Sequence, residues 1–120
     1  MKYLVTAILT LVVCSSLAFA GGFVGQVKVK ETGDPAGYAM VYVITSDEYQ
    51  ECISPYSSHG CSAQGYFNTG PDMEPGYYWL HAVWYDEKSN KYEYWWWGRY
   101  ESGWPNIGIL WVQQDYPCPC

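Results

Sequence analysis

Short apolar or alternating runs recur along the chain, separated by Gly, Pro and Asn, and no run after residue 20 has a helical period. Alternation with a period of two is typical of half-buried strands, and regular turn signals between short strands favour a β-sandwich. We therefore expect an all-β fold, a seven-stranded sandwich of two sheets. The expected strands are 23–30, 39–45, 65–69, 77–85, 91–97 and 107–113, with a weaker one near 50–54.

Residues 1–20 have a different pattern. A basic start is followed by an apolar run at 4–13 and by Ala18-Phe19-Ala20, which is the signature of a cleavable export signal. Cys14 is a poor lipidation site because Val13 stands where a small residue is wanted. No second apolar run follows, so we expect residues 21–120 to form one secreted, periplasmic or cell-surface domain without a membrane span.

Four cysteines follow the signal: Cys52, Cys61, Cys118 and Cys120. In a small exported domain an even number of cysteines indicates disulfides. A bridge between Cys118 and Cys120 would be strained, so the tail is expected to bridge to the 52–61 segment, with Cys61 as the first choice. A zinc site using His59 is the alternative, but it lacks a Cys-x-x-Cys pair. We predict no metal and no cofactor.

Three segments carry a resemblance to a known family. They read TGDPAGYAMVYV at 32–43, QGYF at 64–67 and PGYYWLHA at 75–82. In this order they resemble the carboxypeptidase regulatory-like domains, which have a prealbumin-like (transthyretin-like) Greek-key sandwich. The resemblance covers about 25–83, and it implies an accessory, binding or structural module without an active site.

The residues themselves offer little catalytic chemistry. His59 lies in a segment of loop composition, and His81 is far from it in the sequence. The carboxylate pairs at 47–48 and 86–87 fit solvated loops better than a catalytic or calcium site. A net charge of −6 without a basic stripe argues against nucleic-acid binding. We therefore expect a protein that is not an enzyme.

Aromatic residues are unusually frequent, with 7 Trp, 13 Tyr and 3 Phe in 120 residues. The resemblance places Tyr78, Leu80 and Ala82 in the core, and strand alternation then points their neighbours outward. The same reasoning, extended to 39–45 and 91–97, predicts one outward aromatic sheet face. Its rings are Tyr42, Tyr77, Trp79, Tyr85, Trp95 and Trp97, beside Met40 and Ile44.

An aromatic face of this size is expected to bind something, unless the 50–61 segment or the tail covers it. Trp and Tyr are favoured anchors of protein interfaces, so the first expectation is protein–protein assembly, including self-association. Stacking of a glycan on the same rings is the alternative. The face offers few polar groups for sugar hydroxyls beyond His81 and the tyrosines, which favours a protein partner.

Overall fold

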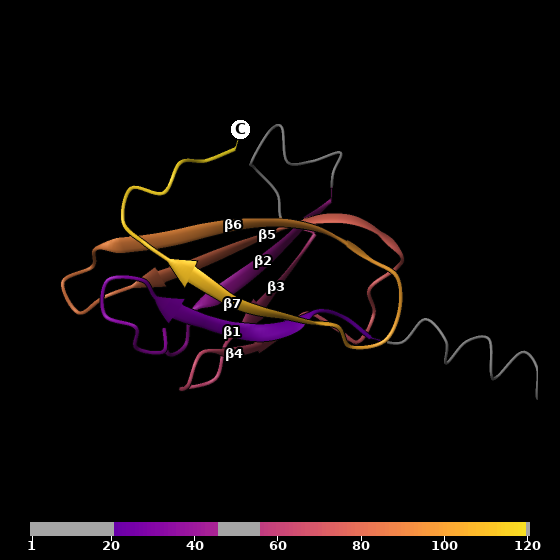
Figure 1. Ribbon diagram of the computed structural model, residues 1–120, viewed down its shortest axis with the longest axis horizontal. Helices are drawn as coiled ribbons and strands as arrows, with labels where there is room; N and C mark the ends of the chain where they lie inside the picture. Colours follow the sequence, from indigo (N-terminus) through magenta and orange to yellow (C-terminus); the bar gives the residue numbers. More distant parts are fainter. Residues whose placement is uncertain (1–20, 46–55, 120) are drawn as a thin grey trace, which may run out of the picture.

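The computed structural model describes residues 21–45 and 56–119 of the chain, and in these ranges every regular element is a β-strand (Figure 1). No helix of the described part is long and apolar enough to cross a membrane. The strands are β1 (Val24–Val29), β2 (Met40–Thr45), β3 (Ser57–Gly60), β4 (Tyr66–Asn68), β5 (Gly76–Tyr85), β6 (Lys91–Tyr100) and β7 (Asn106–Val112).

The seven strands form two sheets that pack face to face (Figure 1). The three-stranded sheet has the order β4-β1-β7, with β1 and β7 parallel, and the four-stranded sheet has the order β3-β2-β5-β6, with all neighbours antiparallel. The two-sheet, all-β architecture is as expected, and β2, β5 and β6 are consecutive in one sheet. This adjacency decides which side chains share an outer face.

Six strands lie within three residues of their expected bounds, and one strand differs from expectation. Strand β3 occupies residues that the composition indicated as a loop, and the weak strand expected near 50–54 falls outside the described residues. Ser57, Ser58, His59 and Gly60 have low strand propensity. They are extended because they pair with the edge of β2, from Val43↔Ser57 to Met40↔Gly60.

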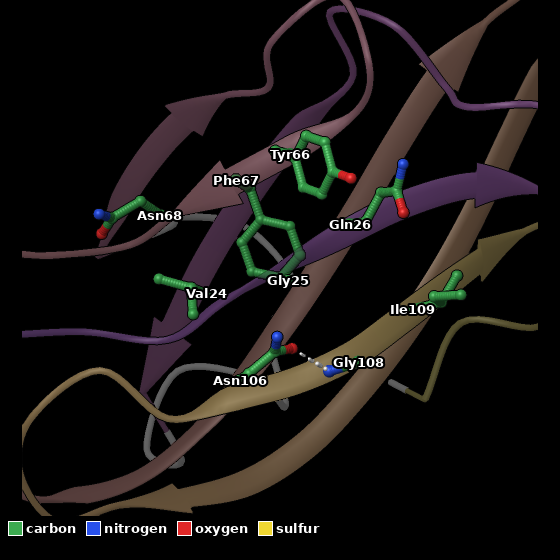
Figure 2. A pocket seen from close by; sticks show the side chains of 9 residues that line it. All are labelled: Val24, Gly25, Gln26, Tyr66, Phe67, Asn68, Asn106, Gly108 and Ile109. Atoms are coloured by element: carbon green, nitrogen blue, oxygen red, sulfur yellow. Dashed lines mark hydrogen bonds between the residues drawn. The ribbon is translucent and has the colours of Figure 1, made fainter.

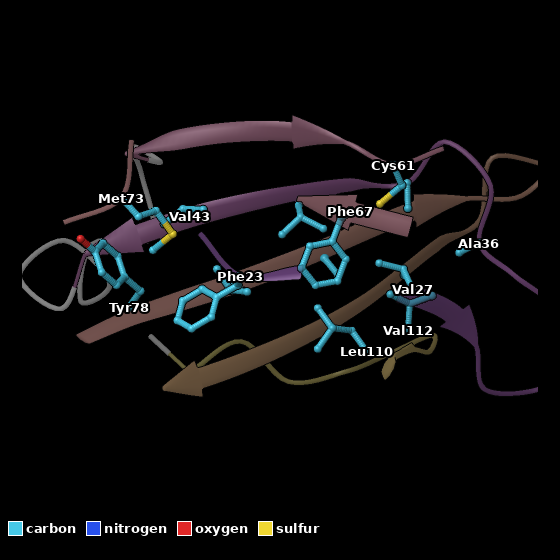
Figure 3. Close-up of a cluster of buried hydrophobic side chains, with 14 of the residues drawn as sticks. Phe23, Val27, Ala36, Val43, Cys61, Phe67, Met73, Tyr78, Leu110 and Val112 are labelled. Carbon is cyan, nitrogen blue, oxygen red and sulfur yellow. The ribbon is translucent and has the colours of Figure 1, made fainter. Parts of the chain in front are cut away.

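The core lies between the sheets and is built from alternate residues of the strands (Figure 3). Tyr78, Leu80 and Ala82 are buried, as their alternation predicts. Aromatic edges close one part of the core, where the ring of Phe23 meets those of Trp96 and Tyr100 at 5.0 and 5.4 Å between centroids. The remaining core is mainly aliphatic and includes Val27, Val41, Val43, Leu110 and Val112.

A glycine is required where the loop before β4 crosses β1. Gly65 has φ of +82°, and a Cβ at this position would lie 2.3 Å from the carbonyl oxygen of Val27. The amide of Val27 in turn donates to the carbonyl of Gly65 at 2.8 Å. A side chain here would break this contact, which explains the glycine of the QGYF segment.

The expected bridge from Cys61 to the tail is wrong. Cys61 is a free thiol that follows β3 and points into the core cluster (Figure 3), while its amide donates to the carbonyl of Ala39. Cys61 is only 6% exposed and belongs to the hydrophobic core cluster. Cys118 is not a free thiol, and Cys52 and Cys120 lie outside the described residues, so the pairing of the tail stays a prediction.

Cys61 should resist alkylation in the native protein. Burial raises the pKa of its thiol to about 11, whereas an ordinary cysteine has a pKa of about 8.5. At pH 8 about one thiol in a thousand is then ionised, so iodoacetamide should label Cys61 at least a hundredfold more slowly in the native protein than in denaturant. Mass spectrometry after timed quenching measures the ratio. Rapid native labelling, or Cys61 found in a disulfide, would contradict this prediction.

Candidate aromatic binding face

The outer face of the four-stranded sheet carries the aromatic residues that the alternation predicts. Cross-strand pairing aligns Tyr42 with His81 on β5, and His81 in turn with Trp95 on β6. Trp79 is paired with Trp97 two residues further along. Directly opposed residues of antiparallel strands lie on the same face, so these five side chains share one surface.

The rings on this face form a continuous series of contacts, which we call the ring ladder: Tyr77, Trp97, Trp79, Trp95, His81 and Tyr42. Successive ring centroids are 5.5, 5.2, 6.1, 3.9 and 6.0 Å apart. Two contacts are close to parallel, Tyr77 on Trp97 at 10° and His81 on Trp95 at 11°. Aromatic pairs of this kind stabilise a surface beyond the area that they bury.

The ring ladder has a buried part and an exposed part. The alternation of side chains along the strands does not predict this difference. Trp95 is only 7% exposed although it lies on the outer face, and Ile44 on β2 is buried as well. At the other end, Tyr77 is 51% and Trp97 is 44% exposed. We call Tyr77 and Trp97 the open end of the face. The guanidinium carbon of Arg99 lies 5.8 Å from the Tyr77 ring centroid beside it.

His81, the imidazole of the ring ladder, is paired with charged side chains of β6. Nε2 of His81 lies 2.8 Å from Oε1 of Glu93, and Nζ of Lys91 lies 3.3 Å from the same oxygen. Burial lowers the pKa of His81, and its hydrogen bond to Glu93 opposes this shift in part. The imidazole is therefore mainly neutral at neutral pH and serves as a stacked, hydrogen-bonded part of the surface.

Tyr85 lies apart from the ring ladder, at the far end of β5. Together with Tyr42 it lines a hollow that also contains Tyr38 and Trp84. Sequence reasoning missed Tyr38, which follows the turn at 32–37. The available signal was a tyrosine directly after Gly37 at the end of a predicted turn, because connecting segments run over the surface.

The opposite sheet has a hollow of its own, shown in Figure 2, with a volume of about 390 Å³. It lies where the register of β1 and β7 shifts by a residue. Its amide side chains are used internally: Gln26 donates to the carbonyl of Gln64, and Asn68 and Asn106 accept from the amides of Gly70 and Gly108. Each of these three side-chain amides thus has a hydrogen-bond partner within the protein, so their presence at the hollow does not by itself indicate a ligand.

Strand β3 carries a Ser–His pair. Ser57 Oγ lies 2.9 Å from His59 Nε2 on β3, and burial lowers the pKa of His59. Within residues 21–45 and 56–119 no third group holds the imidazole, and no cluster of three His, Cys, Asp or Glu side chains could bind a metal. The pair lacks the orienting group that nucleophilic catalysis uses.

Similarity to known proteins is structural. No protein-family model and no curated protein sequence matches the chain. A crystal structure of (S)-allantoin synthase matches with a TM-score of 0.53 and 10% identity, over 83% of this chain and 45% of that chain. Klebsiella pneumoniae 5-hydroxyisourate hydrolase matches with a TM-score of 0.47 and 13% identity, over 83% of this chain and 98% of that chain.

The present chain thus spans less than half the length of the synthase chain. The synthase is an enzyme, so the expectation that this chain is not an enzyme gains no support from this match, while the identity of 10% limits the similarity to the fold. The carboxypeptidase regulatory-like family is likewise not confirmed. What the sheet topology and the synthase match establish together is a prealbumin-like, that is transthyretin-like, β-sandwich.

Proposed function

We propose that the chain is an exported, non-catalytic module of the carboxypeptidase regulatory-like type, whose tail is held by a disulfide. In this proposal the aromatic face mediates protein–protein assembly at the cell surface or in the periplasm. The observation that carries the proposal is the open end, where two large rings stack in solvent on a rigid strand pair. Exposed aromatic clusters of this kind are rare on monomeric proteins.

The pairing of His81, Glu93 and Lys91 favours a protein over a sugar at the ring ladder. His81, Glu93 and Lys91 bind one another, so they offer few free partners to sugar hydroxyls. Protein interfaces instead bury aromatic anchors and Arg, which is the composition at Tyr77, Trp97 and Arg99. Rings held by β5 and β6 also lose little conformational entropy when a partner covers them.

The double replacement of Tyr77 and Trp97 by alanine tests this proposal. We expect the intact protein to self-associate in the micromolar range in sedimentation-velocity experiments, and the double variant to bind at least tenfold more weakly. Truncation of an aromatic hot-spot residue in an interface costs about 2 kcal/mol or more. Both residues are well exposed in the single chain, so the melting temperature should change little.

Tyr66→Ala is the matched control, because Tyr66 is 59% exposed on the other sheet. Its association should equal that of the unchanged protein. Two results would contradict the proposal. One is unaltered association of the double variant. The other is a monomeric intact protein that is retained on an oligosaccharide affinity gel and loses this retention in the double variant, which would favour glycan stacking.

A further inference from the structure

The hollow beside Tyr85 differs in chemistry from the ring ladder. It has a volume of about 230 Å³ and lies where β2 begins and β5 ends. Val83 is buried and Met40 is half-buried, and these two side chains supply an apolar base. Three phenol rings, those of Tyr38, Tyr42 and Tyr85, also line the hollow together with Gly37 and Trp84, and we call it the tyrosine pocket.

Tyr38 has an unfavourable backbone conformation that no packing explains. Its φ is +60°, a left-handed value that is uncommon for a bulky residue, and its side chain is 75% exposed. The turn is held by the backbone, since the amide of Tyr38 donates to the carbonyl of Ser62 at 3.0 Å. A small or polar residue would satisfy the turn more easily. Strain of this kind concentrates at ligand sites.

The hydrogen-bonding capacity of the pocket is unused. In the described part of the chain, the hydroxyls of Tyr38, Tyr42 and Tyr85 make no hydrogen bond to another protein group. The wall of the pocket is fixed by Trp84, whose Nε1 donates to the carbonyl of Gly37 at 3.2 Å. No charged side chain lines the pocket.

From these features we propose that the tyrosine pocket binds one neutral hexopyranose unit of a glycan. A pyranose has an apolar C–H face that can pack on a phenol ring and hydroxyls that can pair with the three phenols. Pockets for drug-sized ligands measure about 300–1,000 Å³, so this smaller one suits a single ring. Without a cation in the lining, the pocket offers nothing to a sulfated or sialylated sugar.

Titration with the methyl glycosides of glucose, galactose and mannose tests the proposal by ¹⁵N–¹H NMR. With at least one of these sugars we expect saturable shifts of the Trp84 Nε1–H and of the amides from Gly37 to Met40. In Tyr38→Asn the apparent affinity should fall at least tenfold, because the ring is lost. Its melting temperature should be unchanged or higher, since Asn tolerates the left-handed region.

Two controls keep this test separate from that of the aromatic face. Tyr66→Asn removes another exposed tyrosine, from the other sheet, and should leave the sugar affinity unchanged. The double variant of Tyr77 and Trp97 should also bind the sugar normally, because these residues do not line the tyrosine pocket. The sugar proposal can therefore stand even if the assembly proposal fails.

Four results would overturn the proposal. The first is that none of the three glycosides shifts the pocket resonances, and the second is that they shift equally in Tyr38→Asn. A polyproline peptide that shifts them when the glycosides do not would make the pocket a peptide site. A clear fall in the melting temperature of Tyr38→Asn would show that Tyr38 serves folding instead of binding.

Discussion

Replacing Trp95 by alanine is expected to destabilise the fold by about 3 kcal/mol, although Trp95 lies on the outer face of its sheet. The ring is nearly fully buried, stacks on His81 and meets the edge of Trp79. Truncation of a buried Phe or Trp costs about 3–5 kcal/mol. The low end applies because the indole N–H of Trp95 has no hydrogen-bond partner among the described residues, and removing an unsatisfied buried donor returns part of the loss.

Trp97→Ala is the matched control for Trp95→Ala. Trp97 belongs to the same strand and the same face but stays well exposed, so the change in unfolding free energy should remain below about 1 kcal/mol. Urea denaturation followed by far-ultraviolet circular dichroism measures both variants. If both variants lost the same unfolding free energy, Trp95 and Trp97 would be equally buried. The division of the ring ladder into a buried and an exposed part would then be wrong.

Tyr78→Ala should cost about 3–5 kcal/mol, the largest loss that we predict. Tyr78 lies on the core side of β5 between two outer-face rings, and its hydroxyl donates to the carbonyl of Glu74 at 2.7 Å. Alanine would therefore leave a cavity and also remove this hydrogen bond. The same burial raises the pKa of Tyr78, so the phenol remains a donor throughout the neutral range.

Tyr78→Phe separates the two contributions. It keeps the ring in the core and removes only the hydroxyl, so we expect a loss of about 1 kcal/mol. Thermal and urea unfolding should rank the two variants in this order. If Tyr78→Ala were as stable as Trp97→Ala, the assignment of β5 side chains to the two faces would be reversed.

The two proposed surfaces use opposite ends of one strand. Tyr77 is the second residue of β5 and lies at the open end, and Tyr85 ends the same strand at the tyrosine pocket. At about 3.4 Å per residue the two are separated by about 27 Å along the strand. A protein on the open end and a sugar in the pocket could therefore be bound together.

The face to which each side chain belongs could be derived from the sequence. Alternation with a period of two, once anchored at Tyr78 and Leu80, places Trp79, Trp95 and Trp97 together, because neighbouring side chains of a strand point to opposite faces. The Gly, Pro and Asn residues between the apolar runs likewise predicted the bounds of most strands. These are local properties of the chain, and they need no knowledge of what lies opposite in space.

Exposure, edge pairing and the state of Cys61 required the tertiary structure. Trp95 and Trp97 have the same parity, yet their burial differs because it depends on neighbours from other strands. Ser57 to Gly60 form a strand only because the edge of β2 supplies their hydrogen bonds. Cys61 is a free thiol buried in the core cluster between the sheets. Tyr38 lines the same pocket as Tyr85 because β2, which follows Tyr38, pairs with β5. Each of these depends on contacts between segments that are distant in the sequence, which local pattern cannot encode.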